Sequence, residues 1–322
     1  MCPNERKEKT RIAAGLLFAR AELAAEPKPV RAGYTEAMRK DIHETNRLSW
    51  NLATVAHNSH KGDQARFLRE GGSTVFPEEL EMLSDLAEKR LVHLQCNAGP
   101  DTLSLAALGA ICTGVDISDE AIDYARKLSI DSGIPADFVR ADLYDWFEEA
   151  IARGETYDRV FTSYGALIWL SDIELWGKSV AKLLAPGGAV ALVEFHPVGL
   201  MYNEKGERDW PYFTHGEPQT DGTGIGDYVA FAGEGLVPWG YEEGITDFEN
   251  PIETNEFLWG IGDVVMSLID AGLVLEVLRE YPYSNGTPRI EHSVEGPGRR
   301  FYLPEGMPNM PQMYALRARK PT

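Results

Sequence analysis

The sequence has little of what marks exported, membrane-spanning or nucleic-acid-binding proteins. Of its three cysteines, Cys96 and Cys112 fall in segments that we predict to be buried strands, so we expect reduced thiols and a cytoplasmic protein. No apolar run approaches the roughly 20 residues that a membrane-spanning helix needs. The apolar run Ile12–Phe18 is cut short by Arg20 and Glu22, which argues against a signal peptide.

Basic residues are also scarce, because 31 Lys and Arg stand against 50 Asp and Glu, a net charge of -19. A strongly acidic protein is repelled by phosphate backbones, and the basic clusters here are short, as at Arg299 and Arg300. We therefore expect neither a nucleic-acid nor a membrane partner. A small-molecule substrate is the expected partner, and the chain is expected to be a monomer or a homodimer.

The most informative pattern is a strand, a glycine-containing turn, a helix and a second strand in direct succession. An acid, Asp116, ends the second strand, where it is placed to accept hydrogen bonds from ribose hydroxyls. Ligands of open parallel sheets bind at this edge, so the pattern predicts a nucleoside-bearing cofactor. The four parts are Leu91–Cys96, Asn97–Gly99, residues 101–110 and Ile111–Val115.

Strands and helices continue to alternate beyond Asp116, which predicts a doubly wound, Rossmann-like α/β fold with a parallel sheet. The turn Ala185–Gly188 is expected to stop a helix before the fifth strand. The expected helices are 77–87, 118–129 with Ser118 as a possible cap, 172–184 and 261–272. The further expected strands are 138–142, 157–163, 189–194, 273–280 and 311–318.

Three segments lie outside this alternation. Residues 1–40 are expected to be an N-terminal extension, either a partly ordered tail or an arm with one helix near 10–25. Residues 41–322 form the main domain, whose residues 41–80 are expected to be lid helices. Residues 196–256 are rich in Gly, Pro, aromatics and acids, and are expected to be a cap insertion over the carboxyl edge of the sheet.

These residues resemble the class I S-adenosylmethionine-dependent methyltransferases. The resemblance rests on the first strand and turn, on Asp116, on Asp142 in Arg-Ala-Asp-Leu, and on the Ala185–Gly188 turn. It implies a seven-stranded sheet whose last strand is antiparallel, and the cofactor S-adenosyl-L-methionine, with S-adenosyl-L-homocysteine as product. The cofactor-binding residues that it implies are Gln95, Asn97, Gly99, Asp101, Asp116, Ile117, Asp142, Leu143 and Ser163.

The turn departs from the family pattern at three positions. The family usually has an acid where His93 stands and glycines where Gln95 and Asn97 stand. The ammonium of the cofactor's amino-acid moiety is then left to Asp101 or to backbone carbonyls, while the two amide side chains could bond the same moiety. A dinucleotide enzyme would need G-x-G-x-x-G, which is absent from this turn.

Candidate residues for the acceptor side follow the fourth and fifth strands. The resemblance implies that Tyr164 lies beside the transferring methyl, where it could orient the nucleophile, and Trp169 either walls the site or packs a helix. His196 is the candidate general base because imidazole titrates near neutral pH, although a lone histidine is more often structural. Tyr281 and Tyr283 could close the far wall, and His57 and His60 could bind substrate from the lid.

The acceptor class is inferred from residues 201–256, which carry 13 acids, two bases and nine aromatics. Acids interleaved with aromatics can hold a cation, which favours an amine-bearing acceptor and N-methylation, unless these acids are a solvated face. S- or O-methylation of a small metabolite is the alternative. The histidines at 43, 57 and 60 match no standard ligand spacing, so we expect no metal.

Two other functions remain to be weighed. An RNA or protein methyltransferase is disfavoured by the acidic charge and by the absence of an Asn-Pro-Pro-Tyr-type motif after the fourth strand. A non-catalytic scaffold that binds S-adenosylmethionine without turnover is the alternative of another class, and the altered turn at 93–97 is what favours it.

Overall fold

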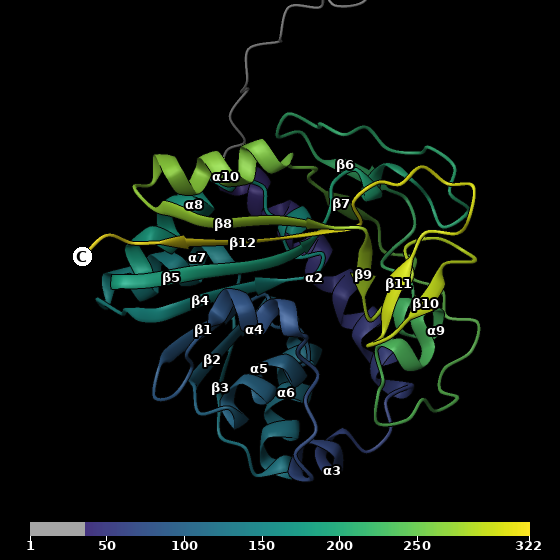
Figure 1. The fold of residues 1–322 in the computed structure, drawn as a ribbon, viewed down its shortest axis with the longest axis horizontal. Helices are drawn as coiled ribbons and strands as arrows, with labels where there is room; N and C mark the ends of the chain where they lie inside the picture. Colours follow the sequence, from purple (N-terminus) through teal and green to yellow (C-terminus); the bar gives the residue numbers. More distant parts are fainter. Residues whose placement is uncertain (1–35) are drawn as a thin grey trace, which may run out of the picture. The chain divides into compact units, whose positions relative to one another are not determined.

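The computed structural model describes residues 36–322, so the helix predicted near 10–25 lies outside the described residues. A seven-stranded sheet forms the centre, in the order β3-β2-β1-β4-β5-β12-β8 (Figure 1). Six strands are parallel, and β12 runs antiparallel to both β5 and β8, so the expected sheet is confirmed. The strands are β1 (Arg90–Leu94), β2 (Ile111–Asp116), β3 (Asp137–Arg140), β4 (Tyr157–Ser163), β5 (Leu184–Phe195), β8 (Val274–Tyr281) and β12 (Met313–Arg319).

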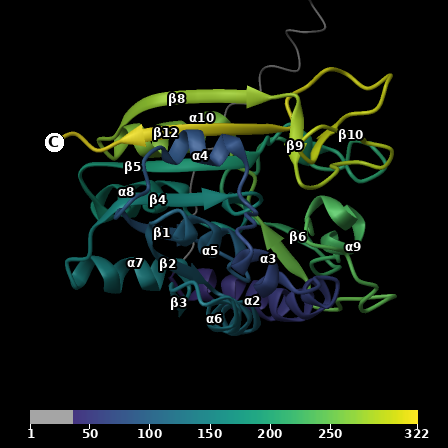
Figure 2. The same cartoon turned by 60° about the horizontal axis from the view of Figure 1, so that its bottom comes forward.

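Helices cover both faces of this sheet because each presents one apolar stripe to it. One face packs against α7 (Leu143–Ala152), α8 (Ile173–Leu183) and α10 (Ile261–Asp270), with Trp176 fully buried among them. The other face packs against α4 (Pro77–Leu83), α5 (Pro100–Ala107) and α6 (Asp119–Ser132) (Figure 2). The core therefore lies in two layers, and the carboxyl ends of the parallel strands remain free to build a site.

Several helix starts could be predicted from the sequence, because polar capping residues mark them. Ser118 does cap α6, accepting a hydrogen bond from the amide of Ala121 at 3.1 Å. The prediction for α4 was too long: the helix ends at Leu83, where Ser84 takes a φ of 57°. The segment 185–188 does stop a helix, since α8 ends at Leu183, but its residues belong to β5, whose pairing with β4 jumps from Tyr157–Leu184 to Arg159–Ala189.

The first described helix, α2 (Glu36–Ser59), begins before the expected lid helices of residues 41–80 and includes His57. It is followed by α3 (Gln64–Arg69), capped by Asp63. Asn46 in α2 exchanges hydrogen bonds with the backbone of Asn255, at 2.9 Å and 2.8 Å. Helix α2 is thereby fixed to the segment 196–256.

The segment 196–256 is mostly irregular, in agreement with its composition. It contains β6 (Gln219–Asp221), α9 (Tyr228–Ala232) and β7 (Thr254–Glu256), and β6 pairs with β7. Residue Phe257 donates its amide to the carbonyl of Ile168 at 2.7 Å, which ties the end of β7 to the loop after β4. Its function as a cap stays a prediction.

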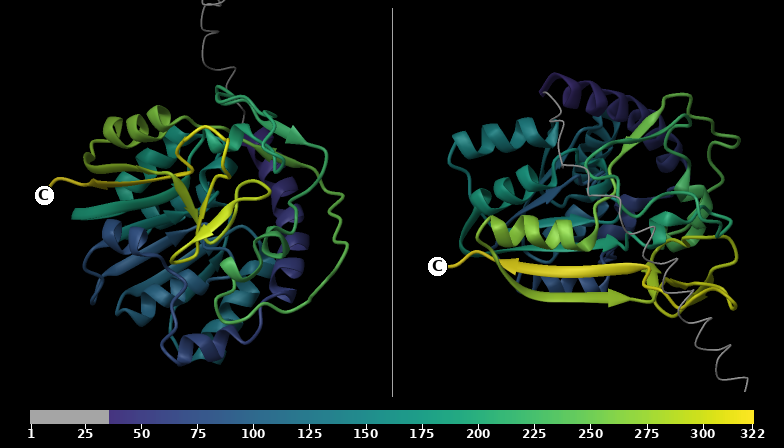
Figure 3. Two further views of the ribbon diagram at one scale, coloured as in Figure 1. Left: turned by 45° about the vertical axis from the view of Figure 1, so that its right-hand side comes forward. Right: turned by 90° about the horizontal axis from the view of Figure 1, so that it is seen from above.

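A second sheet was not predicted. Its strands β9 (Tyr283–Asn285), β10 (Val294–Gly296) and β11 (Arg300–Tyr302) lie in the connection between β8 and β12. This sheet lies beside α9 at the carboxyl edge of the large sheet (Figure 3). Within residues 36–322, no helix has the length and apolar character needed to cross a membrane.

Candidate cofactor and acceptor site

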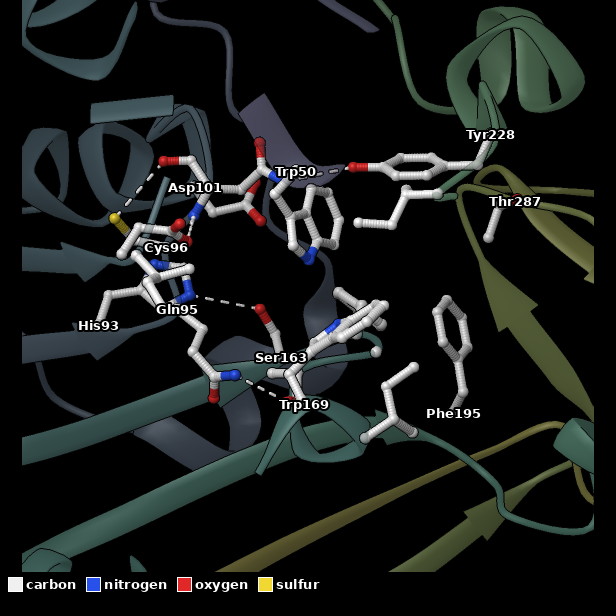
Figure 4. A pocket seen from close by; sticks show the side chains of 18 of the residues that line it. Trp50, His93, Gln95, Cys96, Asp101, Ser163, Trp169, Phe195, Tyr228 and Thr287 are labelled. Atoms are coloured by element: carbon white, nitrogen blue, oxygen red, sulfur yellow. Dashed lines mark hydrogen bonds between the residues drawn. The ribbon is translucent and has the colours of Figure 1, made fainter. Parts of the chain in front are cut away.

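A cavity of about 470 Å³ lies at the carboxyl ends of β1, β2, β4 and β5. Figure 4 shows His93, Gln95 and Asp101 on one side of it and Phe195 and Thr287 on the other. Segments from α2, from residues 225–256 and from residues 285–299 complete its walls. We call the end lined by His93, Gln95 and Asp101 the donor end and the end lined by Phe195 and Thr287 the acceptor end, after the roles that the resemblance implies.

The turn after β1 adopts the left-handed conformation three times. Gln95, Asn97 and Gly99 have φ values of 56°, 49° and 81°. Gly99 is required on a second ground, because a Cβ at this position would stand 2.8 Å from both Ala125 Cβ and Phe138 Cε1. Asn97 stands where the family usually has glycine, and asparagine tolerates the left-handed conformation that it adopts here.

His93 fills the space of the family's acid with a neutral ring. Its Nδ1 lies 2.9 Å from Thr102 Oγ1 and its Nε2 lies 3.4 Å from Ser163 Oγ. Burial lowers the pKa of His93 to about 3, so the imidazole is uncharged at neutral pH. His93 therefore supplies no negative charge to the donor end.

Asp116 ends β2 at the cavity wall, as predicted. Its carboxylate accepts hydrogen bonds from the backbone amides of Asn97, at 2.8 Å, and Ser118, at 2.9 Å. Burial raises the pKa of Asp116, although these hydrogen bonds act in the opposite direction. Each oxygen retains a further lone pair, so the carboxylate can still accept from a ligand. Ile117 lines the cavity beside it.

Asp142 lies one strand further along the same edge and caps α7 through the amide of Tyr144, at 2.8 Å. Its other oxygen lies 2.5 Å from His43 Nδ1, and His43 Nε2 lies 3.0 Å from Ser171 Oγ. Burial alone would raise the pKa of Asp142, but the hydrogen bond and charge of His43 leave it lowered overall. His43 therefore holds Asp142 in place, a role that the spacing of the histidines does not reveal.

The donor end also gathers polar groups without a full set of partners. Gln95 donates Nε2 to the carbonyl of Ala166 at 2.8 Å, which leaves its Oε1 buried without a hydrogen bond. Asp101, bonded to Thr74 Oγ1, has a pKa raised by burial. Lys61, whose pKa burial lowers to about 8, lines the same region, and Trp239 Nε1 is buried without a partner. A ligand that satisfies these groups must offer both a hydrogen-bond donor and a negatively charged group.

Glu194 shapes the loop after β4. This buried carboxylate accepts hydrogen bonds from the backbone amides of Gly165, Ala166 and Leu167, and from that of Phe195. The loop is thereby held open toward the cavity, with Tyr164 at a φ of 44°. Tyr164 lines the cavity, and its hydroxyl accepts from Asn285 Nδ2 at 3.0 Å.

Aromatic rings form one wall of the cavity. Trp50 lies edge-on to Trp169, with ring centroids 5.5 Å apart, and to Tyr228, at 6.3 Å. Trp169 does line the cavity, as predicted. His57 lies behind this wall, with its ring 4.0 Å from that of Tyr228 and its Nε2 2.9 Å from the carbonyl of Gly226. His60 is bonded to Asp227 at 2.8 Å, and neither histidine lines the cavity.

The acceptor end contains two charged side chains that the sequence did not single out. Glu256 ends β7, and burial raises its pKa to about 7. Arg289 lies in the connection after β9, with its guanidinium carbon 4.4 Å from the centroid of the Phe195 ring. Of the 13 acids in residues 201–256, Glu256 is the one that lines the cavity. The other 12 acids, on whose charge the amine-bearing acceptor was inferred, do not line the cavity.

Three expected acceptor residues lie away from the cavity. His196 has both ring nitrogens engaged, because Nδ1 accepts from the amide of Val198 at 3.1 Å and Nε2 lies 2.8 Å from Glu280. Tyr283 donates its hydroxyl to Glu78 at 2.8 Å, and Tyr281 packs beside it. This placement favours structural roles for all three. Across residues 36–322, no group of three or more His, Cys, Asp or Glu side chains could hold a metal ion.

Comparison with known proteins finds similarity to methyltransferases over part of the chain. The sequence profile described as "Methyltransferase domain" matches residues 92–188. The chain is 29% identical over 107 residues to the ubiquinone biosynthesis O-methyltransferase of Saccharophagus degradans, covering 33% of this chain and 44% of that one. It is 32% identical over 110 residues to the enzyme of that name from Proteus mirabilis, covering 34% and 43%.

These matches span less than half the length of those two relatives. Among solved structures, an S-adenosylmethionine-dependent methyltransferase from Mesorhizobium loti is similar, with a TM-score of 0.49, 20% identity, and coverage of 78% of this chain and 99% of that one. The profile match shows that residues 92–188 contain a methyltransferase domain, and the order of the sheet and the acids at the ends of β2 and β3 agree with the class I S-adenosylmethionine-dependent methyltransferases that the sequence resembles.

Proposed function

We propose that the protein transfers a methyl group from S-adenosylmethionine to a hydroxyl oxygen of a small molecule. The observation that carries this proposal is Glu256, a carboxyl with a pKa of about 7 at the acceptor end of the cavity. A hydroxyl must lose its proton on methylation and needs such a base, whereas a neutral amine does not. The curated relatives are named O-methyltransferases, which supports oxygen over the nitrogen that composition favoured.

The donor end fits the cofactor, residue by residue. Asp116 is placed to accept from the ribose hydroxyls, and Asp142 to accept from the adenine amino group. The orphaned Oε1 of Gln95, with the negative charge of Asp101, suits the ammonium of the methionine end. Lys61 suits its carboxylate, as does the unpartnered Nε1 of Trp239. Ile117, Leu143 and Ser163 supply further cavity wall.

The chain contributes to catalysis by aligning the donor with the acceptor, by excluding water and by accepting one proton. The bound cofactor supplies a methyl group made electrophilic by the positive sulfur. Glu256 would take the proton of the acceptor hydroxyl as that oxygen is methylated. The rings of Trp50, Trp169 and Tyr228 exclude water from this path. Tyr164 acts as a positioning residue that holds Asn285 at the acceptor end.

We also propose that α2 and the segment 196–256 act together as a lid and cap over the cofactor. Asn46 and Trp50 from α2 line the cavity, as do Ile225, Tyr228 and Trp239 from the segment. These walls meet through the hydrogen bonds between Asn46 and Asn255. An acceptor could then enter only when these contacts loosen.

The test is methyl transfer from radiolabelled S-adenosylmethionine to a panel of hydroxyl-bearing and amine-bearing small molecules. We expect label on oxygen, identified by mass spectrometry of the products. Label on nitrogen alone would replace this function by N-methylation. Tight cofactor binding without any transfer across the panel would point to a scaffold.

A further inference from the structure

The acceptor end of the cavity contains a cation without a counter-ion. Arg289 lines the cavity and, within the described residues, forms neither an ion pair nor a hydrogen bond. Its Nε is sealed from solvent with no partner. The side chain is only half-buried, but a cation whose Nε is sealed from solvent without an acceptor is costly, so its place in a ligand cavity points to a ligand that pairs with it.

The acids that interact electrostatically with Arg289 do not serve as its counter-ion. Glu194 is saturated by the backbone amides of the loop after β4. Glu256 acts on Arg289 only at longer range, because no ion pair within 4.0 Å joins them. Glu204 likewise acts on Arg289 without an ion pair, so these three acids leave the hydrogen-bonding edge of the guanidinium free for a ligand.

The guanidinium is also held in a fixed orientation. Its face lies against the ring of Phe195, at 4.4 Å from carbon to centroid, which directs its planar edge rather than its face toward a partner. The backbone before it is tied down, because Asn285 bonds Glu78 at 3.1 Å and Tyr164 at 3.0 Å. A planar fork fixed in this way matches the two oxygens of a carboxylate.

Building on the proposed function, we propose that Arg289 binds a carboxylate of the acceptor, so that the substrate is a small hydroxylated acid. The guanidinium grips the acidic group at one end of the molecule, and Glu256 meets the hydroxyl to be methylated. This assignment reverses the charge expected from the composition of residues 201–256. Two other cations, Lys61 and Arg299, lie at the donor end. Both interact electrostatically with Asp101 and are not part of this pair.

The experiment measures binding without turnover, so that it stands apart from the proposed reaction. Protein saturated with S-adenosylhomocysteine is titrated with 4-fluorobenzoate and, separately, with the neutral 4-fluorobenzamide, and fluorine NMR reports binding. We expect Arg289→Gln to weaken 4-fluorobenzoate binding about tenfold or more and to leave the benzamide unchanged. Arg289→Lys should retain part of the preference, because it keeps the charge and loses the fork.

Arg279→Gln is the matched control, since Arg279 is an exposed arginine paired with Glu81 on the protein surface. Equal S-adenosylhomocysteine binding and equal thermal midpoints would show that each variant is folded. Benzoate binding that is absent, or that Arg289→Gln leaves intact, would overturn the inference. The proposed reaction would fail separately, by the absence of O-methylated product from the wild-type protein.

Discussion

The two charged side chains of the acceptor end differ in how they would respond to substitution. Glu256→Gln removes the base while conserving the shape of the side chain, so kcat for a hydroxyl acceptor should fall about 100-fold or more. Donor binding should remain within about twofold. Glu253→Gln, an exposed glutamate three positions earlier, is the control. A Glu256→Gln enzyme with full activity would remove Glu256 from the mechanism.

The pH dependence of the rate should report the same residue. Because the base must be deprotonated, kcat should rise with pH through about 7, the pKa to which burial raises Glu256. In Glu256→Gln the residual rate should lose this rise. The measurement is initial rate with saturating donor and acceptor at pH values from about 5.5 to 8.5.

Asp116 makes a different prediction, on donor affinity alone. Asp116→Asn loses one charged acceptor at the place proposed for the ribose hydroxyls, so the Kd for S-adenosylhomocysteine should rise about tenfold. Isothermal calorimetry measures it. Asp123→Asn, on the exposed side of α6, should leave the Kd unchanged. An equal Kd in both variants would contradict the proposed role.

Sequence reasoning reached the donor residues that follow strands and missed the residues that complete the site. Asp116 and Asp142 could be found because the end of a parallel strand fixes where a side chain points. Lys61, Glu256 and Arg289 stand on turns and short strands, where no periodicity indicates direction. The three arginines of residues 289–300 are the available signal for Arg289, but Arg299 and Arg300 indicated only a short basic cluster.

At the scale of an element, the turn that joins β1 to α5 depends on one glycine for two separable reasons. Gly99→Ala should destabilise the protein by a few kcal/mol, because it combines a positive φ with a clash against Phe138 and Ala125. Gly133→Ala supplies the control, since Gly133 has a φ of 70° and nothing within 4 Å. It should cost only about 1 kcal/mol. Urea unfolding of both variants measures the difference, and equal costs would show that the close approach is unimportant.

Elements with strong periodicity were predictable, and the short ones were not. Strand β4 was predicted with its observed limits, because its residues 157–163 have a clear apolar pattern between polar turns. The strands β9, β10 and β11 span three residues each and are separated by Gly and Pro, so no alternation distinguishes them from loops. The segment 185–188 stops α8 as predicted, but it forms an irregularity within β5 and not a turn before it, because pairing with β4 begins already at Leu184 and resumes at Ala189.

At the scale of the whole molecule, buried neutral histidines should make the protein acid-labile. Burial lowers the pKa of His93 to about 3 and of His57 to about 4. The unfolded chain binds protons at these sites near pH 6.5, so stability is present above that value and is lost as pH falls toward 4 and 3. Each site contributes on the order of a few kcal/mol.

Glu256 acts in the opposite sense, because a raised carboxyl pKa makes stability fall as pH rises from about 4.5 to 7. A comparison of variants isolates the histidine effect. Urea unfolding free energies at pH 5 and pH 7 should differ less for His93→Gln than for the wild type. The exposed His292, changed to Gln, should leave the difference unaltered. A wild-type protein equally stable at both pH values, with no shift in His93→Gln, would refute the prediction.

The placement of the second sheet has a consequence for how such proteins diversify. Residues 283–302 leave the large sheet after β8 and return before β12, and both of those strands are locked into register with each other. A connection between two strands that are already paired can be lengthened, shortened or exchanged while the register of the sheet is preserved. The matched interval, 92–188, stops before this connection begins. With Arg289 binding the acceptor as proposed, grafting residues 283–302 from a relative should change the acceptor while the large sheet is kept.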